Sequence, residues 1–185
     1  MKPVGCIVKA GHLMLNTCPY GGGLWHTWFD RDLGLAGRVL FRGGNGEIQA
    51  RLFRINKGIA RIPNLAIHLS DSRNKFEPNL HEHLQAVLSV SQDSLDKKND
   101  DDSRFHPVLL DVVARASGVP SSDIVDMELQ LIDIQPSAIG GAADDLLFSG
   151  RLDNLCSSYQ CIRALADGSA ENIADQTNVR IAALF

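Results

Sequence analysis

Histidine and carboxylate residues that could do chemistry are spread along the chain. His81 and His83 flank Glu82, and side chains of these types bind zinc. On a helix, residues two positions apart point to different sides, so these two histidines cannot share one metal. His68 ends a β-rich segment, where a histidine usually packs or hydrogen-bonds. Asp153 stands before an apolar helical stripe, where aspartate commonly caps the helix. Residue type alone therefore does not define a catalytic site.

The densest stretch of the chain is Tyr20–Asp32, which combines three consecutive glycines with both tryptophans, Trp25 and Trp28. The charged triplet Asp30–Asp32 follows directly, and His26 is placed to hydrogen-bond one of its two aspartates. Aromatic side chains beside charged pairs are typical of a junction between domains or between subunits. A loop that binds substrate is the alternative interpretation of the same residues.

The composition is that of an ordinary globular protein. Among 185 residues, 44% are hydrophobic and 22% charged, with a net charge of −4, so the sequence offers no basic patch for nucleic acid. No apolar run approaches the roughly 20 residues that span a membrane, and no signal peptide is recognisable. The four cysteines, Cys6, Cys18, Cys156 and Cys161, form no CxxC pair. This pattern predicts reduced thiols in a cytoplasmic protein.

Strand patterns dominate the first part of the chain. Apolar alternation and turn residues predict strands at Val4–Val8, His12–Leu15, Gly37–Phe41, Glu47–Ile55 and Ile59–Leu69, with a hairpin at Gly43–Gly46. The alternation of Ile48, Ala50 and Leu52 changes phase at Phe53 and Ile55, which predicts a bulge.

Helical patterns begin further along. Leu80, Leu84, Val87 and Leu88 predict a helix from Asn79, with Glu82 in a capping box. A second helix is predicted at Pro107–Ser117 and stops at Gly118; its inward residues are Val108, Leu109, Val112, Val113 and Ala116. A short helical turn is predicted at Ser121–Val125. A third helix is predicted after Asp153 or Asn154, either of which would cap it, and its apolar stripe is Leu155, Tyr159, Ile162 and Ala166.

The remaining segments are predicted as strands and loops. Met127–Ile134, Leu146–Phe148 and Val179–Phe185 are the predicted strands, the last one buried on both faces. The predicted loops are Ser91–Ser103, which is polar and solvated rather than an acidic site, and Pro136–Ala143.

Four segments together resemble one enzyme family. They are Tyr20–Asp32 (YGGGLWHTWFDRD), Arg61–His68 (RIPNLAIH), Ile134–Pro136 (IQP) and Ser149–Asn154 (SGRLDN), and they occur in the order found in the aspartyl aminopeptidases. The resemblance runs over nearly the whole chain. It implies a metallopeptidase that carries two zinc ions and removes Asp or Glu from the N-terminus of peptides.

The resemblance also implies a fold and a domain plan. The expected fold class is α/β, with an α+β inserted oligomerisation domain of β-hairpins and helices between pieces of an α/β catalytic domain. Residues 1–18 would belong to the catalytic domain, residues 19–146 to the inserted domain, and residues 147–185 to the return into the catalytic domain. Tyr20–Asp32 would then be the hinge where the inserted domain leaves the catalytic one. The inserted domain would make a homo-oligomer.

Two residues match functional positions of the family. Asp153 matches the aspartate that bridges the two metal ions, which must lie close enough together for one carboxylate to give an oxygen to each. His68 matches a histidine that reaches into the active site of a neighbouring subunit, where it binds substrate or stabilises charge during attack on the peptide carbonyl.

The family's remaining functional groups have no counterpart in this sequence. A histidine motif would precede Met1, and a glutamate pair supplying the general base and a metal ligand would follow Phe185. No catalytic residue is therefore expected in this chain, and its zinc site would be incomplete. The sequence predicts a fragment of such an enzyme, inactive alone. The alternative is a non-catalytic oligomerisation or interaction module derived from that family.

Overall fold

The computed structural model describes residues 1–70, 74–97, 105–169 and 176–184. These residues divide into an N-terminal unit, Met1–Ile134, and a C-terminal unit, Gln135–Phe185. The described residues form both strands and helices, and their sheets do not close on themselves. This agrees with the predicted α/β fold class.

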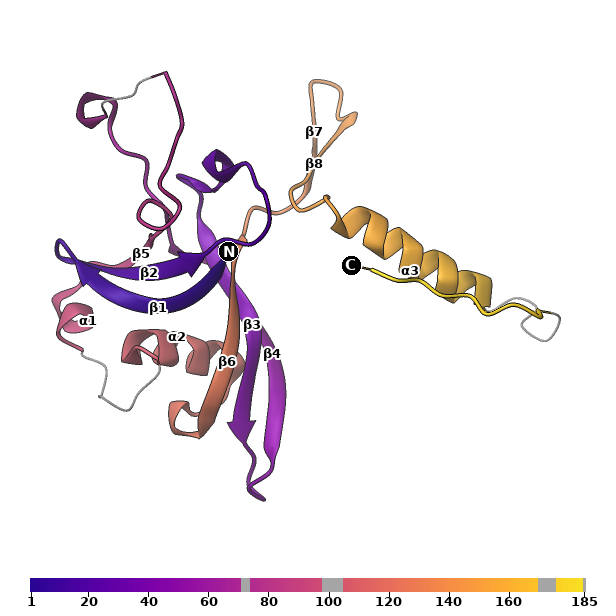
Figure 1. Ribbon diagram of the computed structural model, residues 1–185, viewed down its shortest axis with the longest axis horizontal. Coiled ribbons are helices and arrows are strands. Elements are labelled where there is room, and N and C mark those ends of the chain that lie inside the picture. The colour runs from indigo at the N-terminus through magenta and orange to yellow at the C-terminus, as the bar shows by residue number, and fades with distance from the viewer. Residues whose placement is uncertain (71–73, 98–104, 170–175, 185) are drawn as a thin grey trace. The chain divides into compact units, whose positions relative to one another are not determined.

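Two three-stranded antiparallel sheets build the N-terminal unit (Figure 1). The first has the order β1-β2-β5, with β1 at Lys2–Lys9, β2 at His12–Cys18 and β5 at Ala86–Ser89. The second has the order β4-β3-β6, with β3 at Leu33–Arg42, β4 at Ile48–Ala60 and β6 at Ile124–Asp133. The predicted hairpin at residues 43–46 is confirmed, and residues 10–11 form the turn between the predicted strands that correspond to β1 and β2. Such turns depend on residues that are adjacent in sequence.

The bulge predicted at Phe53 and Ile55 is wrong, because β4 pairs with β3 without a register shift from Ile48 to Ile55. The register shift lies beyond this stretch. Leu33 pairs with Ala60 while Leu35 pairs with Ile55, so β4 carries extra residues between Ile55 and Ala60. The inward face of this strand carries Phe53, which is buried, whereas Ile48 remains 52% exposed. The phase change in the sequence thus marks where the apolar row that faces the core begins.

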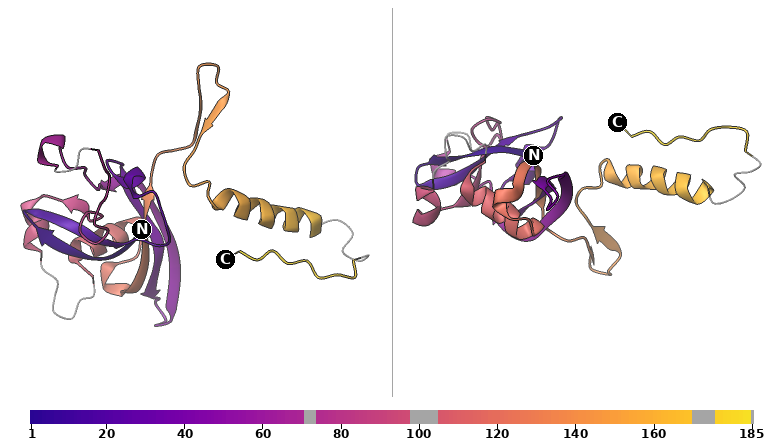
Figure 2. Two further views of the ribbon diagram at one scale, coloured as in Figure 1. Left: turned by 45° about the horizontal axis from the view of Figure 1, so that its top comes forward. Right: turned by 90° about the horizontal axis from the view of Figure 1, so that it is seen from below.

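The described residues of the N-terminal unit also form four short helical segments and one longer helix. They are η1 (Trp25–Trp28), η2 (Ile67–Leu69), α1 (Gln92–Asp96), η3 (Ser121–Asp123) and α2 (Pro107–Ser117). Figure 2 shows α2 alongside both sheets. One hydrophobic core joins α2 to both sheets through buried leucines such as Leu15, Leu35, Leu109 and Leu131. Burial of these side chains is the main contribution to the stability of the unit.

Helix α2 confirms the prediction for residues 107–117. His106 caps its N-terminus, since Nδ1 accepts a hydrogen bond from the Val108 backbone N–H at 3.2 Å. Gly118 ends it in the left-handed conformation, with φ at 67°. The inward position predicted for Ala116 is wrong, because Ala116 is exposed and Ser117 is buried in its place.

The helix predicted from Asn79 is wrong. Residues 80–84 form a turn, with a hydrogen bond from His83 N–H to Asn79 O at 2.8 Å, and strand β5 follows. The Asn79 side chain accepts from the backbone N–H groups of His81 and Glu82. The Asn79 N–H donates to His83 Nδ1 at 3.0 Å rather than to Glu82, so the reciprocal bond of a capping box is not formed. Leu84 and Ala86 are fully buried two residues apart, which is the period of a strand that packs on the core.

The C-terminal unit contains β7 (Ala138–Gly140), β8 (Leu146–Phe148) and α3 (Leu155–Ser169). Strand β8 and the helix after Asn154 agree with the predictions, whereas β7 lies inside the predicted loop Pro136–Ala143 and pairs with β8. None of the described residues of this unit is buried.

The buried strand predicted at Val179–Phe185 is wrong for residues 179–184. These residues form no strand, and Val179 and Ile181 are 86% and 79% exposed. A buried strand needs neighbours on its edges and faces, and no strand of the described residues pairs with this segment. The predicted loop Ser91–Ser103 contains the short helix α1, and its residues 98–103 lie outside the described part of the chain. No helix within the described residues has the length and apolar character needed to cross a bilayer.

Candidate active-site segments

His68 lies on a loop whose base is fixed on two sides. On one side, Arg61 and Val87 exchange backbone hydrogen bonds of 3.1 and 2.8 Å. On the other, Asp30 N–H donates to Ile62 O at 2.9 Å, and Ile62 is fully buried. Ile62 therefore belongs to the core of the N-terminal unit, the backbone of Arg61 is held by β5, and the loop departs from there.

The Asp30 side chain also holds Asn64, two residues beyond Ile62. Its Oδ1 accepts from the Asn64 backbone N–H at 3.0 Å, and its Oδ2 accepts from Asn64 Nδ2 at 3.0 Å. Asp30 has a positive φ of 57°, a conformation that aspartate and asparagine tolerate better than most residues. Both carboxylate oxygens of Asp30 are thus used by one asparagine of the loop.

The tip of the loop is exposed and apolar. His68 is the central residue of η2, which Leu69 N–H closes by donating to Ala66 O at 2.8 Å. Around it, Leu65, Ile67 and Leu69 are 63%, 57% and 70% exposed. The segment stands clear of both sheets in Figure 1. An exposed imidazole between exposed apolar side chains is suited to contact another surface.

The expected partner of His26 is wrong. Asp30 binds Asn64, Asp32 pairs with Arg61, and the His26 ring packs edge-to-face against Phe76 with centroids 5.9 Å apart. The third residue of the charged triplet, Arg31, forms an ion pair with Asp133 at 2.7 Å.

Trp25 and Trp28 are partly buried and pack against the core of the N-terminal unit. The preceding residues Tyr20–Leu24 are exposed. The Tyr20–Asp32 stretch therefore anchors one unit internally, and its predicted part in a junction between domains or subunits stays a prediction.

Asp153 lies in the C-terminal unit, in a turn that leads into α3. Cys156 N–H donates to Leu152 O at 2.8 Å and Ser158 N–H to Asn154 O at 3.0 Å, which closes the first turn of the helix around it. The side chain is exposed. It is thus an accessible carboxylate at a helix start, where the positive end of the helix dipole attracts negative charge.

The described residues do not by themselves provide a zinc site. Nowhere among them do three His, Cys, Asp or Glu side chains gather closely enough to hold a metal ion. His81 and His83 lie in a turn, and His83 Nδ1 accepts from the Asn79 backbone N–H at 3.0 Å. One carboxylate, Asp153, is fewer than the three or four protein ligands that zinc requires.

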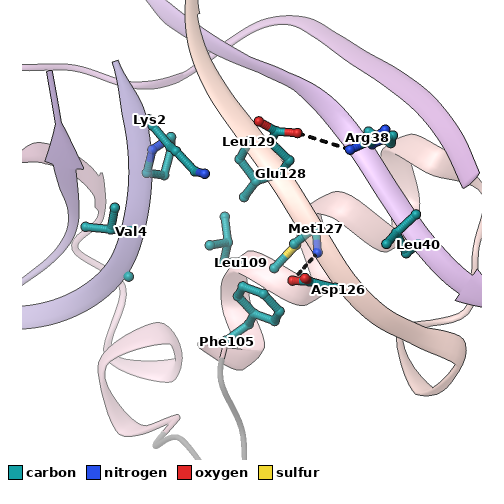
Figure 3. Close-up of a pocket in the computed structure, with 12 residues that line it drawn as sticks. Lys2, Val4, Arg38, Leu40, Phe105, Leu109, Asp126, Met127, Glu128 and Leu129 are labelled. Carbon is teal, nitrogen blue, oxygen red and sulfur yellow. Dashed lines mark hydrogen bonds and ion pairs between the residues drawn. The ribbon is translucent and has the colours of Figure 1, made fainter. Parts of the chain in front are cut away.

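A cavity of about 450 Å³ lies between β1 and β6 and is lined by both charged and apolar residues (Figure 3). Lys2 points across it toward β6, where Glu128 pairs with Arg38 at 3.4 Å. Phe105 and Leu109 contribute apolar walls. His68 is not among the residues that line this cavity.

Comparison with known proteins identifies the family. The family model described as "Aminopeptidase I zinc metalloprotease (M18)" matches residues 1–185. The chain belongs to the M18 aminopeptidase family. This M18 chain is 42% identical over 215 residues to a probable aspartyl aminopeptidase of Ricinus communis, covering 100% of the chain and 44% of the relative. It therefore spans less than half the length of this curated relative.

Solved structures agree with the family and the fold. The M18 chain matches the cryo-EM structure of the Ape4 and Nbr1 complex with a TM-score of 0.80 and 36% identity, over 92% of this chain and 34% of that one. It matches the S. cerevisiae mApe1 dodecamer with a TM-score of 0.70 and 29% identity, over 92% of this chain and 36% of that one.

The contact between Asp30 and Asn64 was not predicted. The two residues are 34 positions apart and belong to two different segments, so spacing alone could not join them. A hint was available, because both residues fall inside segments that carry the family resemblance.

Proposed function

We propose that this chain is the middle part of an aspartyl aminopeptidase, a zinc-dependent enzyme that removes Asp or Glu from the N-terminus of peptides. The proposal rests on the 42% identity to a probable aspartyl aminopeptidase across the entire chain. Residues 1–18 and 147–185 are assigned to the catalytic domain and residues 19–146 to the inserted oligomerisation domain. The four free thiols fit a cytoplasmic enzyme.

Asp153 is assigned to the metal centre of the complete enzyme as the carboxylate between two zinc ions. Its exposure and its place at the start of α3 support this role, since both oxygens can be reached from outside the unit. The other ligands and the general base are assigned to parts of the complete enzyme outside this chain. Alone, the 185-residue chain is proposed to be inactive.

His68 is assigned to substrate binding in a neighbouring subunit. Its exposed position on an apolar loop supports this role, since a buried or internally bonded histidine could not reach another chain. The match to the mApe1 dodecamer supports a homo-oligomer.

The decisive experiment compares the 185-residue chain with the full-length enzyme that contains it. Bound zinc and hydrolysis of an Asp-linked chromogenic substrate are measured for both, and for Asp153→Asn and His68→Ala in the full-length enzyme. We expect Asp153→Asn to lose zinc and turnover together. His68→Ala should keep its zinc and lose about 10²-fold in turnover, the scale for one removed charge-stabilising group.

The competing function is a non-catalytic interaction module. It is favoured by the complete core of the N-terminal unit, which needs no contribution from the C-terminal unit. Full zinc and turnover in the Asp153→Asn variant would overturn the metal assignment. A full-length protein that assembles without any turnover would favour the module.

A further inference from the structure

We infer that Asp30 and Asn64 are positioning residues that hold the His68 loop in the conformation used at the active site. The inference rests on the function proposed for His68. It concerns the two hydrogen bonds described above, from the Asn64 backbone N–H and Asn64 Nδ2 to the two oxygens of Asp30, both 3.0 Å long.

The geometry gives this pair a specific task. Backbone pairing with Val87 and Asp30 holds the chain as far as Ile62, and Pro63 has no N–H to continue a ladder. Asn64 is therefore the last fixed point before residues 65–69, whose side chains are exposed. Among the described residues, another hydrogen bond that shapes the segment from Pro63 to His68 is the one that closes η2, from Leu69 N–H to Ala66 O.

The Asp30 backbone supports the same conclusion. A residue with φ at 57° adopts a conformation that costs energy for most side chains. In this conformation the Asp30 N–H donates to Ile62 O, and the Asp30 carboxylate accepts two hydrogen bonds from Asn64. One residue thus ties the Tyr20–Asp32 stretch to the base and to the last fixed residue of the His68 loop.

The pair allows a test by exchange of the two side chains. Asn64→Asp places two carboxylates together and removes the side-chain donor. Asp30→Asn keeps an acceptor for the Asn64 backbone N–H, and the Asn64 amide can turn over so that its oxygen accepts from the amide nitrogen introduced at position 30. In the double variant Asp30→Asn/Asn64→Asp, the amide oxygen introduced at position 30 accepts from the backbone N–H of residue 64. The amide nitrogen at position 30 donates to the carboxylate introduced at position 64. Both hydrogen bonds are restored, and asparagine keeps the positive φ.

The measurements are kcat and KM of the full-length enzyme together with hydrogen exchange of the amides of residues 64–69. Asn64→Asp should lower kcat/KM about tenfold, because the competent loop conformation becomes a minor one, and the exchange variant should recover most of that loss. Asp30→Asn alone should have only a small effect. Hydrogen exchange should rise in Asn64→Asp and return in the double variant. In a His68→Ala background, Asn64→Asp should cause no further loss.

Glu47→Gln is the matched control. Glu47 forms the same kind of carboxylate–amide pair with Asn45, at 2.7 Å, in the distant hairpin turn, and its replacement should change neither readout. A thermal unfolding curve of each variant identifies any general loss of folding.

The possible outcomes separate the two proposals. His68→Ala with unchanged turnover would count against the function proposed for His68. If His68→Ala is impaired while Asn64→Asp is not, or if the double variant is no better than Asn64→Asp, the positioning role is wrong.

Discussion

The two units of this chain differ in how they use their apolar residues. Every fully buried side chain of the described residues belongs to the N-terminal unit, where leucines from both sheets and from α2 meet. In the C-terminal unit, Leu155, Tyr159 and Ile162 form the expected helical stripe but are 61%, 65% and 52% exposed. The comparison shows that a regular apolar pattern specifies an element without supplying the surface that it packs on.

The two candidate functional residues lie in different units, one with its own core and one without buried residues among those described. His68 projects from a unit with its own core, while Asp153 begins a helix whose apolar stripe is uncovered among the described residues. We therefore expect the His68 loop to keep its shape in the isolated chain. The geometry around Asp153 should depend on the other parts of the complete enzyme.

The largest expected difference between the two units is the loss of stability when one apolar side chain is truncated in each. Leu35→Ala removes a fully buried side chain of β3, the strand that pairs with both β4 and β6, and should lower the free energy of unfolding by about 2–5 kcal/mol. Ile162→Ala, at a half-exposed position of α3, should change it by less than about 0.5 kcal/mol. Urea denaturation followed by tryptophan fluorescence measures this, because both tryptophans lie in the N-terminal unit. Equal effects would show that the two units share one core.

The reactivity of the cysteine thiols should also differ between the two units. Burial raises the pKa of the Cys6 thiol to about 12, whereas Cys156 and Cys161 are exposed on α3. Because the thiolate is the reactive form, alkylation of Cys6 near pH 8 should be at least about 100-fold slower than that of the α3 thiols. Peptide mapping after timed labelling gives the rates, and the unfolded chain in guanidinium is the control. Fast labelling of Cys6 would mean that β1 opens readily.

Acidification should have a smaller effect, confined to the N-terminal unit. Burial lowers the pKa of His106 from 6.5, so the neutral ring is favoured in the folded state. Its stabilising contribution is complete above pH 6.5 and is lost as the pH falls through the lower folded pKa, because a protonated Nδ1 cannot accept from Val108 N–H. Between neutral pH and about pH 5, the loss should be about 1 kcal/mol.

The variant His106→Asn tests that interpretation. Asparagine can cap the helix without titrating, so its unfolding free energy should vary less with pH than that of the unchanged protein. The same pH dependence in both proteins would assign the effect to other groups.

Prediction from the sequence succeeded where the deciding interactions are local. The hairpin turns and both ends of α2 were predicted because glycine, proline and cap residues act on the backbone beside them. It failed at residues 79–88, where Leu80, Leu84 and Leu88 fit a helical period, while Leu84, Ala86 and Leu88 equally fit a strand. The outcome depended on β2, which pairs with β5 from more than 60 residues away.

The sequence by itself therefore determined the family, the local turns and caps, and the residue types at His68 and Asp153. Only the tertiary structure decided that Asp30 binds Asn64 rather than His26, that Ala86–Ser89 is a strand, and that residues 179–184 are not one. The physical reason is the range of the interactions involved. Turns and caps form between neighbouring residues, whereas strand pairing, burial and the Asp30–Asn64 contact depend on which distant segments the core brings together.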